Sequence, residues 1–183
     1  MRKTILLLLF IISVQQNFAQ TWVDSLDMYA REKYMPPSKF NWTWMKASLV
    51  YTMVKQHDNI SDENQKKNYL DFVKTAMDKT YKQANGKVPN AVASGLGMAF
   101  LYRVTKDIKY KKACDKIYAD YLKIKRTKDG AVSHLPAHRE LWDDTVFMIG
   151  QFLMELYKAT GDEKYIDELF KQISLHREKL QDS

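Results

Sequence analysis

The sequence has little cysteine, glycine or proline: one, six and four residues respectively in a chain of 183. Because Cys114 has no partner in the chain, no intrachain disulfide can form, and the fold must be stabilised by packing. Runs of β-branched residues are also scarce, which argues against a protein built from β-sheets. After residue 20, no apolar stretch approaches the roughly 20 residues that a membrane helix needs. These absences favour an all-α protein.

The first 20 residues differ from the rest of the chain. They begin with Arg2 and Lys3, continue with an apolar run over residues 5–14, and reach a small residue at Ala19. The run is too short to span a bilayer and is typical of a secretory signal peptide. We therefore expect an exported protein with a bacterial-type signal peptide at 1–20, a periplasmic or extracellular location, and one domain over residues 21–183.

Basic residues outnumber acidic ones by 29 to 22. Without residues 1–20, which contain Arg2, Lys3 and no acid, the counts are 27 and 22, a net charge of +5. The basic residues are scattered along helical patterns instead of forming a run, which argues against a nucleic-acid partner, as does export. An anionic polysaccharide, or its fragments, fits this charge and this location better.

Apolar residues recur at three- and four-residue spacing along almost the whole chain, which is the periodicity of amphipathic helices. The spacing predicts helices at about 22–34, 40–57, 62–83, 90–105, 108–126, 141–160 and 162–180. Turn-forming residues separate them, namely Pro36-Pro37, Gly86 with Pro89, Asp129-Gly130 and Gly161-Asp162.

Two of the helix junctions repeat each other. Residues 101–110 (LYRVTKDIKY) match residues 156–165 (LYKATGDEKY), and in both copies an Asp is placed to cap the second helix. In the second copy, residues 146–156 are apolar on nearly every side, whereas 165–173 are amphipathic, so the first helix is expected to be an inner one. This asymmetry predicts a toroid of helical hairpins around a lumen. A solenoid such as a tetratricopeptide array is the alternative, although its repeat is usually shorter.

Adjacent carboxylates, Asp143 and Asp144, stand in the stretch LWDDTVFM at the start of the most apolar helical segment after residue 20. A buried carboxylate is costly unless it is paired or hydrogen-bonded. Acids at a helix N-terminus commonly satisfy free N–H groups, and spacing alone favours that role. The two acids need not share one role, however, since Asp143 could cap the helix while Asp144 faces the cavity.

Residues suited to sugar binding surround these acids. Trp142 lies beside them, His134 lies in the loop upstream, and Trp42 and Trp44 open an earlier helix that is also expected to be an inner one. Aromatic faces can stack on sugar rings, and a histidine can donate to a hydroxyl or a carboxylate. Each residue also has a structural interpretation, which is core packing for the tryptophans and a surface loop for His134.

Taken together, these motifs resemble a known enzyme family. The stretch LWDDTVFM, with the Gly-x-x-x-His of 130–134 before it and the Thr-Gly-Asp-x-x-Tyr of 160–165 after it, is similar to the unsaturated glucuronyl and rhamnogalacturonyl hydrolases of glycoside hydrolase families 88 and 105. Residues 41–44 and 89–114 resemble the preceding helices of that family. The resemblance implies an (α/α)6 toroid and neither a metal nor an organic cofactor.

The resemblance also implies a reaction. These enzymes act on the 4,5-unsaturated uronic acid that polysaccharide lyases leave at the end of an oligosaccharide. By this resemblance Asp144, the third position of Trp-x-Asp, is the catalytic acid/base, which protonates C4 and activates a water that adds at C5. The hydrated product then opens and releases the next sugar. Trp44, Asn90, His134 and Trp142 are implied to bind the oligosaccharide, and no nucleic acid or membrane is expected as a partner.

The chain departs from the family pattern in two respects. Asn90 stands where the family commonly has Asp, and an amide can form hydrogen bonds but neither carries charge nor acts as a base. The sequence also provides about half of the hairpins of a ring of six, so we expect an incomplete toroid with exposed apolar flanks. A complementary C-terminal half or self-association is the expected partner. An inactive fragment, or a non-catalytic helical-repeat module that binds a glycan or a protein, is the alternative to an active hydrolase.

Overall fold

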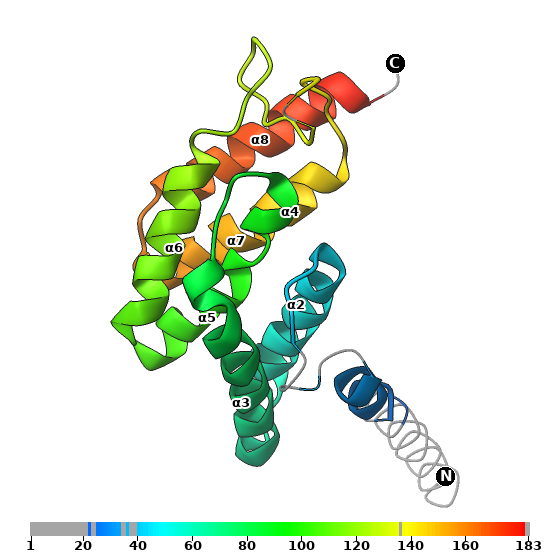
Figure 1. The fold of residues 1–183 in the computed structure, drawn as a ribbon, viewed down its shortest axis with the longest axis vertical. Helices are drawn as coiled ribbons and strands as arrows, with labels where there is room; N and C mark the ends of the chain where they lie inside the picture. Colours follow the sequence, from blue (N-terminus) through cyan, green and yellow to red (C-terminus); the bar gives the residue numbers. More distant parts are fainter. Residues whose placement is uncertain (1–21, 23–24, 34–35, 37–39, 136, 182–183) are drawn as a thin grey trace, which may run out of the picture. The chain divides into compact units, whose positions relative to one another are not determined.

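The computed structural model describes residues 22, 25–33, 36, 40–135 and 137–181 (Figure 1). The expected signal peptide at 1–20 lies outside these residues. The chain divides into two units, Met1–Phe40 and Asn41–Ser183. In the first unit, residues 25–33 are helical, within the helix expected at 22–34. Arg31 forms an ion pair with Asp27, one turn earlier in this helix, at 2.9 Å.

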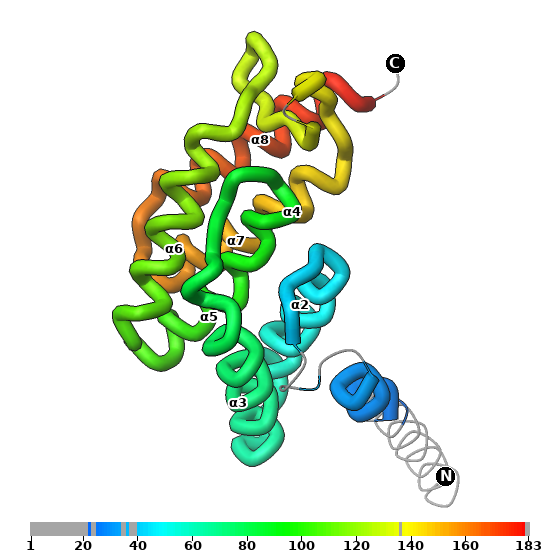
Figure 2. The backbone as a smooth tube through the Cα atoms, in the orientation of Figure 1, coloured from blue at the N-terminus to red at the C-terminus, as the bar shows by residue number. Residues whose placement is uncertain are grey.

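The second unit is built from helices that form three antiparallel hairpins (Figures 1 and 2). The hairpin helices are α2 (Trp44–Asn59), α3 (Glu63–Thr80), α5 (Gly95–Thr105), α6 (Ile108–Tyr121), α7 (Asp144–Thr160) and α8 (Lys164–Leu180), with a 3₁₀ helix η2 (Tyr81–Gln83) and a short α4 (Pro89–Val92) between α3 and α5. Within the described residues there is no strand, only isolated bridges between Arg126 and Val132 and between Leu135 and Glu140. The prediction of an all-α protein is confirmed.

The first helices of the three hairpins form the interior of this unit. Helix α5 packs against both α2 and α7, and every residue from Gly95 to Leu101 is buried. A Cβ atom at Gly95 would lie 2.2 Å from the Phe152 ring, so glycine is needed for α5 and α7 to approach this closely. The second helices, α6 and α8, each bury one face. The inner and outer helices expected of a toroid are therefore present.

Both copies of the repeated junction make the same turn. The Thr105 hydroxyl accepts a hydrogen bond from the Asp107 N–H at 3.2 Å, and the Asp107 carboxylate accepts one from the Lys109 N–H at 3.0 Å. The second copy makes the equivalent bonds, at 3.3 and 3.2 Å, with Thr160, Asp162 and Lys164. The residue after the first helix is left-handed in each copy, with φ values of 58° at Lys106 and 71° at Gly161. The predicted repeat is thus a structural one.

Several helix bounds differ from the predicted ones because local hydrogen bonds redirect the backbone. The helix expected at 90–105 is interrupted after Val92, where both the N–H and the hydroxyl of Ser94 donate to the Ala91 carbonyl. The helix expected at 108–126 ends at Tyr121, since the N–H of Ile124 donates to the Tyr121 carbonyl, three residues earlier, in a tighter turn. The helix expected at 141–160 begins at Asp144.

An ionic cluster joins the C-terminal ends of the three inner helices. Arg103 of α5 donates to Glu155 of α7 and, at 2.9 and 2.8 Å, to both carboxylate oxygens of Asp58 in α2. Lys158 lies 3.4 Å from Glu155 and 3.9 Å from Asp58. Burial opposes ionisation of Asp58, but hydrogen bonds from Arg103 and His57 outweigh it and hold the pKa of Asp58 below its usual range. The cluster fixes the relative positions of α2, α5 and α7.

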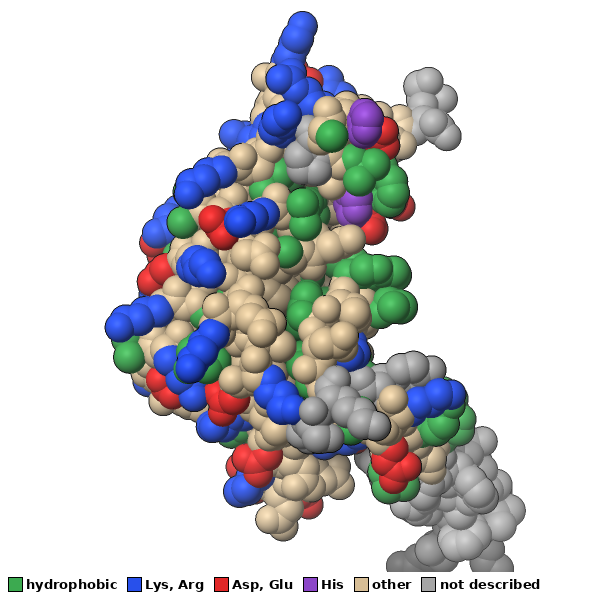
Figure 3. All heavy atoms as spheres, viewed as in Figure 1, with side chains coloured by type: hydrophobic (Ala, Val, Ile, Leu, Met, Phe, Trp, Pro, Cys, Tyr) green, Lys and Arg blue, Asp and Glu red, His purple; other side chains and the backbone are tan. Residues whose placement is uncertain are grey.

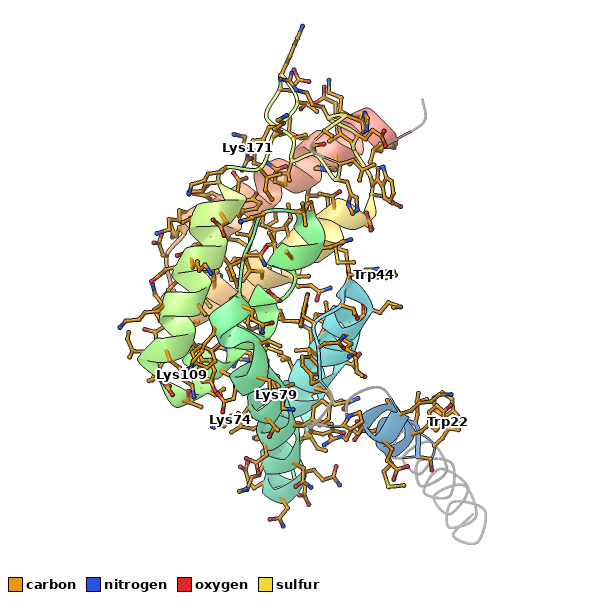
Figure 4. All side chains as sticks on the ribbon, in the orientation of Figure 1. Trp22, Trp44, Lys74, Lys79, Lys109 and Lys171 are labelled. Carbon is orange, nitrogen blue, oxygen red and sulfur yellow. The ribbon has the colours of Figure 1, made fainter. Side chains whose placement is uncertain are left out.

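A second polar cluster joins the outer helices α3 and α6. Asp78 accepts from Tyr110 at 2.6 Å and from Lys74 at 2.7 Å, and it forms an ion pair with Lys109 at 2.7 Å. Figure 4 labels the two lysines on this side of the molecule. Partial burial raises the pKa of Asp78, but the hydrogen bonds from Lys109, Lys74 and Tyr110 outweigh it and lower the pKa to about 2. Ionised Asp78 therefore stabilises the folded chain.

We expect the stabilisation from Asp78 to depend on pH. Because its folded-state pKa of about 2 lies below the usual pKa of an aspartate, 3.8, the stabilisation is fully present above about pH 4 and is lost as the pH falls toward 2. Asp78→Asn should thus lower the free energy of unfolding by about 1–2 kcal/mol at pH 7 and by much less near pH 2. Urea unfolding at both pH values measures the difference.

Asp71→Asn is the matched control on the same helix. Among the described residues, Asp71 forms an ion pair with Lys67 alone, one turn away, and the pair is exposed to solvent. This variant should unfold like the parent at both pH values. An Asp78→Asn deficit that stays the same from pH 7 to pH 2 would contradict the assigned ionisation.

Candidate functional site

The N-terminal ends of the inner helices meet in a small apolar cluster. Ala47 of α2, Met148 of α7 and Ala93, just before α5, pack together in the interior, and Trp42 packs against them. The indole N–H of Trp42 also donates to the Asn90 carbonyl of α4 at 3.4 Å. The helix ends that carry the predicted site residues therefore lie at the same end of the unit.

Helix α8 holds the loop that leads into α7. The Gln172 side chain accepts from the Val132 N–H at 2.8 Å and donates to the Gly130 carbonyl at 3.1 Å. Arg126 donates to the same carbonyl at 3.1 Å and to Glu168 at 2.8 Å. With its backbone fixed at these points, the loop can present a side chain in a defined position at the start of α7.

That side chain is His134, which is only 6% exposed. Its Nδ1 lies 3.0 Å from the Thr145 hydroxyl, with hydrogen-bond geometry, and 3.1 Å from Oδ1 of Asp144. Oδ1 of Asp144 is buried and has no hydrogen-bond partner within the described part of the chain. The Asp144 side chain as a whole is 42% exposed, so the same carboxyl group contacts His134 and reaches a surface that is open to a ligand.

Trp142 completes this group. Its ring stacks on the His134 ring with centroids 4.4 Å apart and an interplanar angle of 3°. The indole N–H donates to the Glu140 carboxylate at 3.2 Å, which fixes the orientation of the ring. With 43% of the residue exposed, part of the ring remains open to a ligand. Figure 3 shows histidine, apolar and acidic side chains gathered along this edge of the molecule.

The two adjacent acids face different surroundings. Asp143 precedes α7, and its carboxylate accepts from the Asp144 N–H at 2.8 Å, in agreement with the predicted capping role. Asp143 also lines an open cavity of about 500 Å³, together with Tyr51 of α2, Leu96 of α5 and Phe147 of α7. Asp144 lies next to His134 instead, with its Oδ1 3.1 Å from Nδ1 of the histidine. Of the two acids, Asp143 is the one that lines the 500 Å³ cavity.

The remaining predicted residues lie at the same end but outside the Asp144 group. Trp44 is the first residue of α2 and is 50% exposed (Figure 4). Asn90 lies in α4, and its side-chain oxygen is buried without a hydrogen bond from any described residue, as is the hydroxyl of Thr43. His134, Trp142 and Asp144 are thus in mutual proximity, and Trp44 and Asn90 belong to neighbouring helix ends.

Comparisons with known proteins identify the family. The model of Glycosyl Hydrolase Family 88 matches residues 14–183. The chain belongs to this family. The unsaturated rhamnogalacturonyl hydrolase YesR of Bacillus subtilis (strain 168) is 27% identical over 154 residues, which are 78% of this chain and 43% of YesR. The family inferred from the sequence motifs is therefore confirmed.

A solved structure shows the same fold. The crystal structure of a possible member of the GH105 family from Klebsiella pneumoniae subsp. pneumoniae MGH 78578 matches with a TM-score of 0.62 and 22% identity, over 75% of this chain and 37% of that one. The chain thus spans less than half the length of either relative. The family 88 fold is present here as a partial toroid.

Sequence reasoning missed some residues of the candidate site. Thr145 follows the two acids directly, and its position one residue after Asp144 could have marked it as a partner for His134. Gln172 and Glu168 lie about 40 residues beyond the loop that they hold, so no local signal marked them. None of the described residues form a group of three or more His, Cys, Asp or Glu suited to a metal ion. Nor does the described part contain a helix long and apolar enough to cross a membrane.

Proposed function

We propose that this family 88 protein removes 4,5-unsaturated uronic acid residues from oligosaccharides that polysaccharide lyases produce. Membership in a glycoside hydrolase family supports the general activity, and YesR is named for the corresponding rhamnogalacturonyl reaction. The approach of Oδ1 of Asp144 to Nδ1 of His134, at 3.1 Å, is the observation that carries the proposal to this site. We further propose that residues 1–20 direct export, so that residues 21–183 act outside the cytoplasm.

Asp144 is the proposed acid/base. In its protonated form it donates a proton to C4 of the unsaturated sugar, which leaves C5 electron-deficient and open to attack by water. The Asp144 carboxylate then accepts a proton from that water as its oxygen bonds to C5. The resulting hemiketal opens, and the next sugar leaves with its hydroxyl restored. The anomeric carbon is not attacked directly, which separates this route from two-carboxylate glycosidases.

The other predicted residues bind and position the substrate. Thr145 positions the His134 ring through the 3.0 Å hydrogen bond between its hydroxyl and Nδ1, and the same nitrogen lies 3.1 Å from Oδ1 of Asp144. The exposed part of Trp142 offers an aromatic face on which a sugar ring can stack. Trp44 and Asn90 extend the binding surface to the neighbouring helix ends.

The test uses the conjugated double bond of the substrate, which absorbs ultraviolet light. The purified chain is incubated with lyase-generated unsaturated uronyl disaccharides, and loss of absorbance is followed. The matched control substrate is a saturated nitrophenyl glucuronide, which lacks the double bond that hydration requires. We expect turnover of the unsaturated substrates alone, with deuterium incorporated at C4 when the reaction runs in D₂O. Release of nitrophenol from the saturated control would contradict the hydration route.

A second candidate function is sugar binding without catalysis. It is favoured by Asn90, an uncharged side chain whose buried oxygen receives no hydrogen bond from any described residue. This candidate predicts that calorimetry detects binding of the unsaturated disaccharide by the folded chain while its absorbance does not change. Turnover by the parent chain would exclude it.

A further inference from the structure

The outer helix α6 and the loop that follows it carry most of the net charge of the chain. Residues 108–128 contain eight basic side chains and two acidic ones, an excess of +6, whereas residues 21–183 as a whole have an excess of +5. The remainder of residues 21–183 is therefore close to neutral. Figure 3 shows Lys and Arg side chains along the edge of the molecule that α6 and this loop form. Basic residues that are scattered in the sequence thus gather at one surface.

Three lysines form a row on the exposed side of α6. Lys112 and Lys116 lie on the helix, and Lys123 lies in the turn after it, where its N–H donates to the Asp120 carbonyl at 3.0 Å. All three residues are exposed, and steps of four and seven residues place them on one stripe of the helix. With a rise of about 1.5 Å per residue, this lysine row is roughly 16 Å long.

The acids near the lysine row already have partners. Asp115 forms an ion pair with Lys111 at 2.5 Å, and the Asp120 carboxylate accepts from the Gly86 N–H at 3.4 Å. None of the acids that the structure describes forms an ion pair with a lysine of the row. Like charges one turn apart on a helix, as in the first step of the row, repel each other. The row is thus a line of positive charge that a bound anion would stabilise.

The lysine row belongs to the middle hairpin and not to an edge of the partial toroid. Helix α6 packs against α5 of its own hairpin, and α5 in turn lies between α2 and α7. One side of α6 is buried in the interior, namely Tyr110, Ala113, Cys114, Ile117 and Tyr121. The lysine row lies on the opposite side, which faces outward as expected of an outer helix. A hairpin added at either edge of the partial ring would therefore leave the row exposed.

We propose that the lysine row is a docking surface for an acidic polysaccharide, a polymer of uronic acids that lies along α6. Such a polymer carries carboxylates on successive sugars, so one chain can meet several lysines at once, and the weak contacts reinforce each other. Between the charges, Ala119 is exposed and Leu122 is 54% exposed. These apolar side chains offer a surface for the C–H faces of the sugar rings.

The loop after α6 extends the positive surface toward α8. Lys125 and Lys128 are exposed in this loop. Lys171 of α8 also reaches the loop, because a Cβ atom at Gly130 would lie 3.7 Å from its Nζ (Figure 4). The same loop continues to His134 of the candidate site. A polymer longer than the row therefore meets further positive charge on the way to the end of the unit where the candidate site lies.

The chemistry of the lysine row favours a polysaccharide over a membrane or a nucleic acid. A helix that lies in a membrane surface exposes a broad apolar face, whereas the apolar face of α6 is buried. Nucleic-acid surfaces combine arginine forks with exposed aromatic rings, but Tyr110 and Tyr121 are buried and Arg126 pairs with Glu168 at 2.8 Å. The choice of a uronate polymer rests on the proposed function, although the row itself does not.

The first test is the binding of polygalacturonate, a uronate polymer that has not been cut by a lyase, to the purified full chain by calorimetry. We expect binding that weakens about tenfold when the salt concentration rises fourfold, because counterions are released on binding. The triple variant Lys112→Gln, Lys116→Gln and Lys123→Gln should weaken binding by at least about tenfold at low salt. Its helical circular dichroism should equal that of the parent, since the three side chains are exposed.

The matched control combines Lys67→Gln, Lys79→Gln and Lys106→Gln. These exposed lysines lie on α3 and after α5, so the net charge changes by the same amount away from the row. The control should bind polygalacturonate with nearly the affinity of the parent. Asp144→Asn should do so as well, because docking needs no turnover. Failure of the proposed hydrolysis would therefore leave this result unchanged.

Three outcomes would overturn the docking proposal. The first is a parent chain that does not bind polygalacturonate at low salt. The second is an equal loss of affinity in the two triple variants, which would assign the binding to net charge alone. The third is tighter binding to vesicles of anionic lipid, or to a single-stranded oligonucleotide, with the same dependence on the lysine row, which would assign the row to a membrane or a nucleic acid instead.

Discussion

Asp144→Asn is expected to lower kcat/KM on unsaturated uronyl disaccharides by about 10²- to 10⁴-fold, the range that general acid–base catalysis contributes. The substitution keeps the size of the side chain and its position beside His134, but an amide can neither deliver nor accept the proton that hydration requires. The variant should bind the disaccharide with nearly the affinity of the parent. Loss of ultraviolet absorbance and calorimetric binding, measured on the same sample, separate the two effects.

Asp143→Asn is the matched control, since it makes the same change one residue earlier. The Asp143 carboxylate accepts the Asp144 N–H at 2.8 Å, and asparagine can replace it in that bond. We expect kcat/KM within about tenfold of the parent, because asparagine is among the best capping residues. The opposite result, a large loss with Asp143→Asn and a small one with Asp144→Asn, would assign the proton transfer to the acid that lines the 500 Å³ cavity. Asp144 would then only position its neighbours.

Glu155→Gln is expected to cost about 2–4 kcal/mol in the free energy of unfolding, among the largest effects of any single substitution in this chain. Glu155 is 3% exposed, and it accepts from Arg103 and lies 3.4 Å from Lys158. Removing its charge leaves Arg103, which is partly buried, with Asp58 as its remaining ionic partner. The expected loss of unfolding free energy is smaller than the full cost of breaking a buried ion pair, because Arg103 retains some contact with solvent. Urea unfolding at neutral pH measures the change.

A double-mutant cycle separates the ion pair from the effect of packing. Glu155→Gln, Arg103→Gln and the double variant should show a coupling free energy of at least about 1 kcal/mol between the two positions. Glu178→Gln, on the exposed side of α8, is the surface control and should change the stability by less than about 0.5 kcal/mol. Additive effects of Glu155→Gln and Arg103→Gln would show that the cluster does not join the inner helices.

The features that the sequence predicted correctly arise from short stretches of chain. The 3.6-residue periodicity identified the hairpin helices of the second unit, although not α4 or η2 as separate helices, and the Thr-x-Asp turns at 105–107 and 160–162 specified where two hairpins reverse. The inner position of α5 and α7 followed from their almost uninterrupted apolar character. For α7, however, one residue of that apolar segment is Glu155, whose partners are Arg103 on α5 and Lys158 on its own helix.

What the sequence could not predict depends on residues far apart in the chain. Arg103 meets Asp58 and Glu155 across 45 and 52 positions, and no periodicity encodes such a meeting. The sequence also could not predict which way the side chains of Asp143 and Asp144 point, because their directions depend on where the loop places His134. That loop is in turn held by Gln172, which lies 40 positions after Val132. The break in the helix expected at 90–105 lies where both the N–H and the hydroxyl of Ser94 donate to the Ala91 carbonyl, and the apolar periodicity does not mark it.

The repeated turns have a consequence for how the chain folds. Each turn satisfies its polar groups with its own residues, as Thr105 and Asp107 do in the first copy. A hairpin with such a turn needs no distant segment to reverse direction, and contacts between neighbouring segments form quickly. The hairpins can therefore form one after another during synthesis, from the N-terminus onward. In that order the nascent chain gains its core stepwise, and each new hairpin docks on a surface that the previous one has already formed.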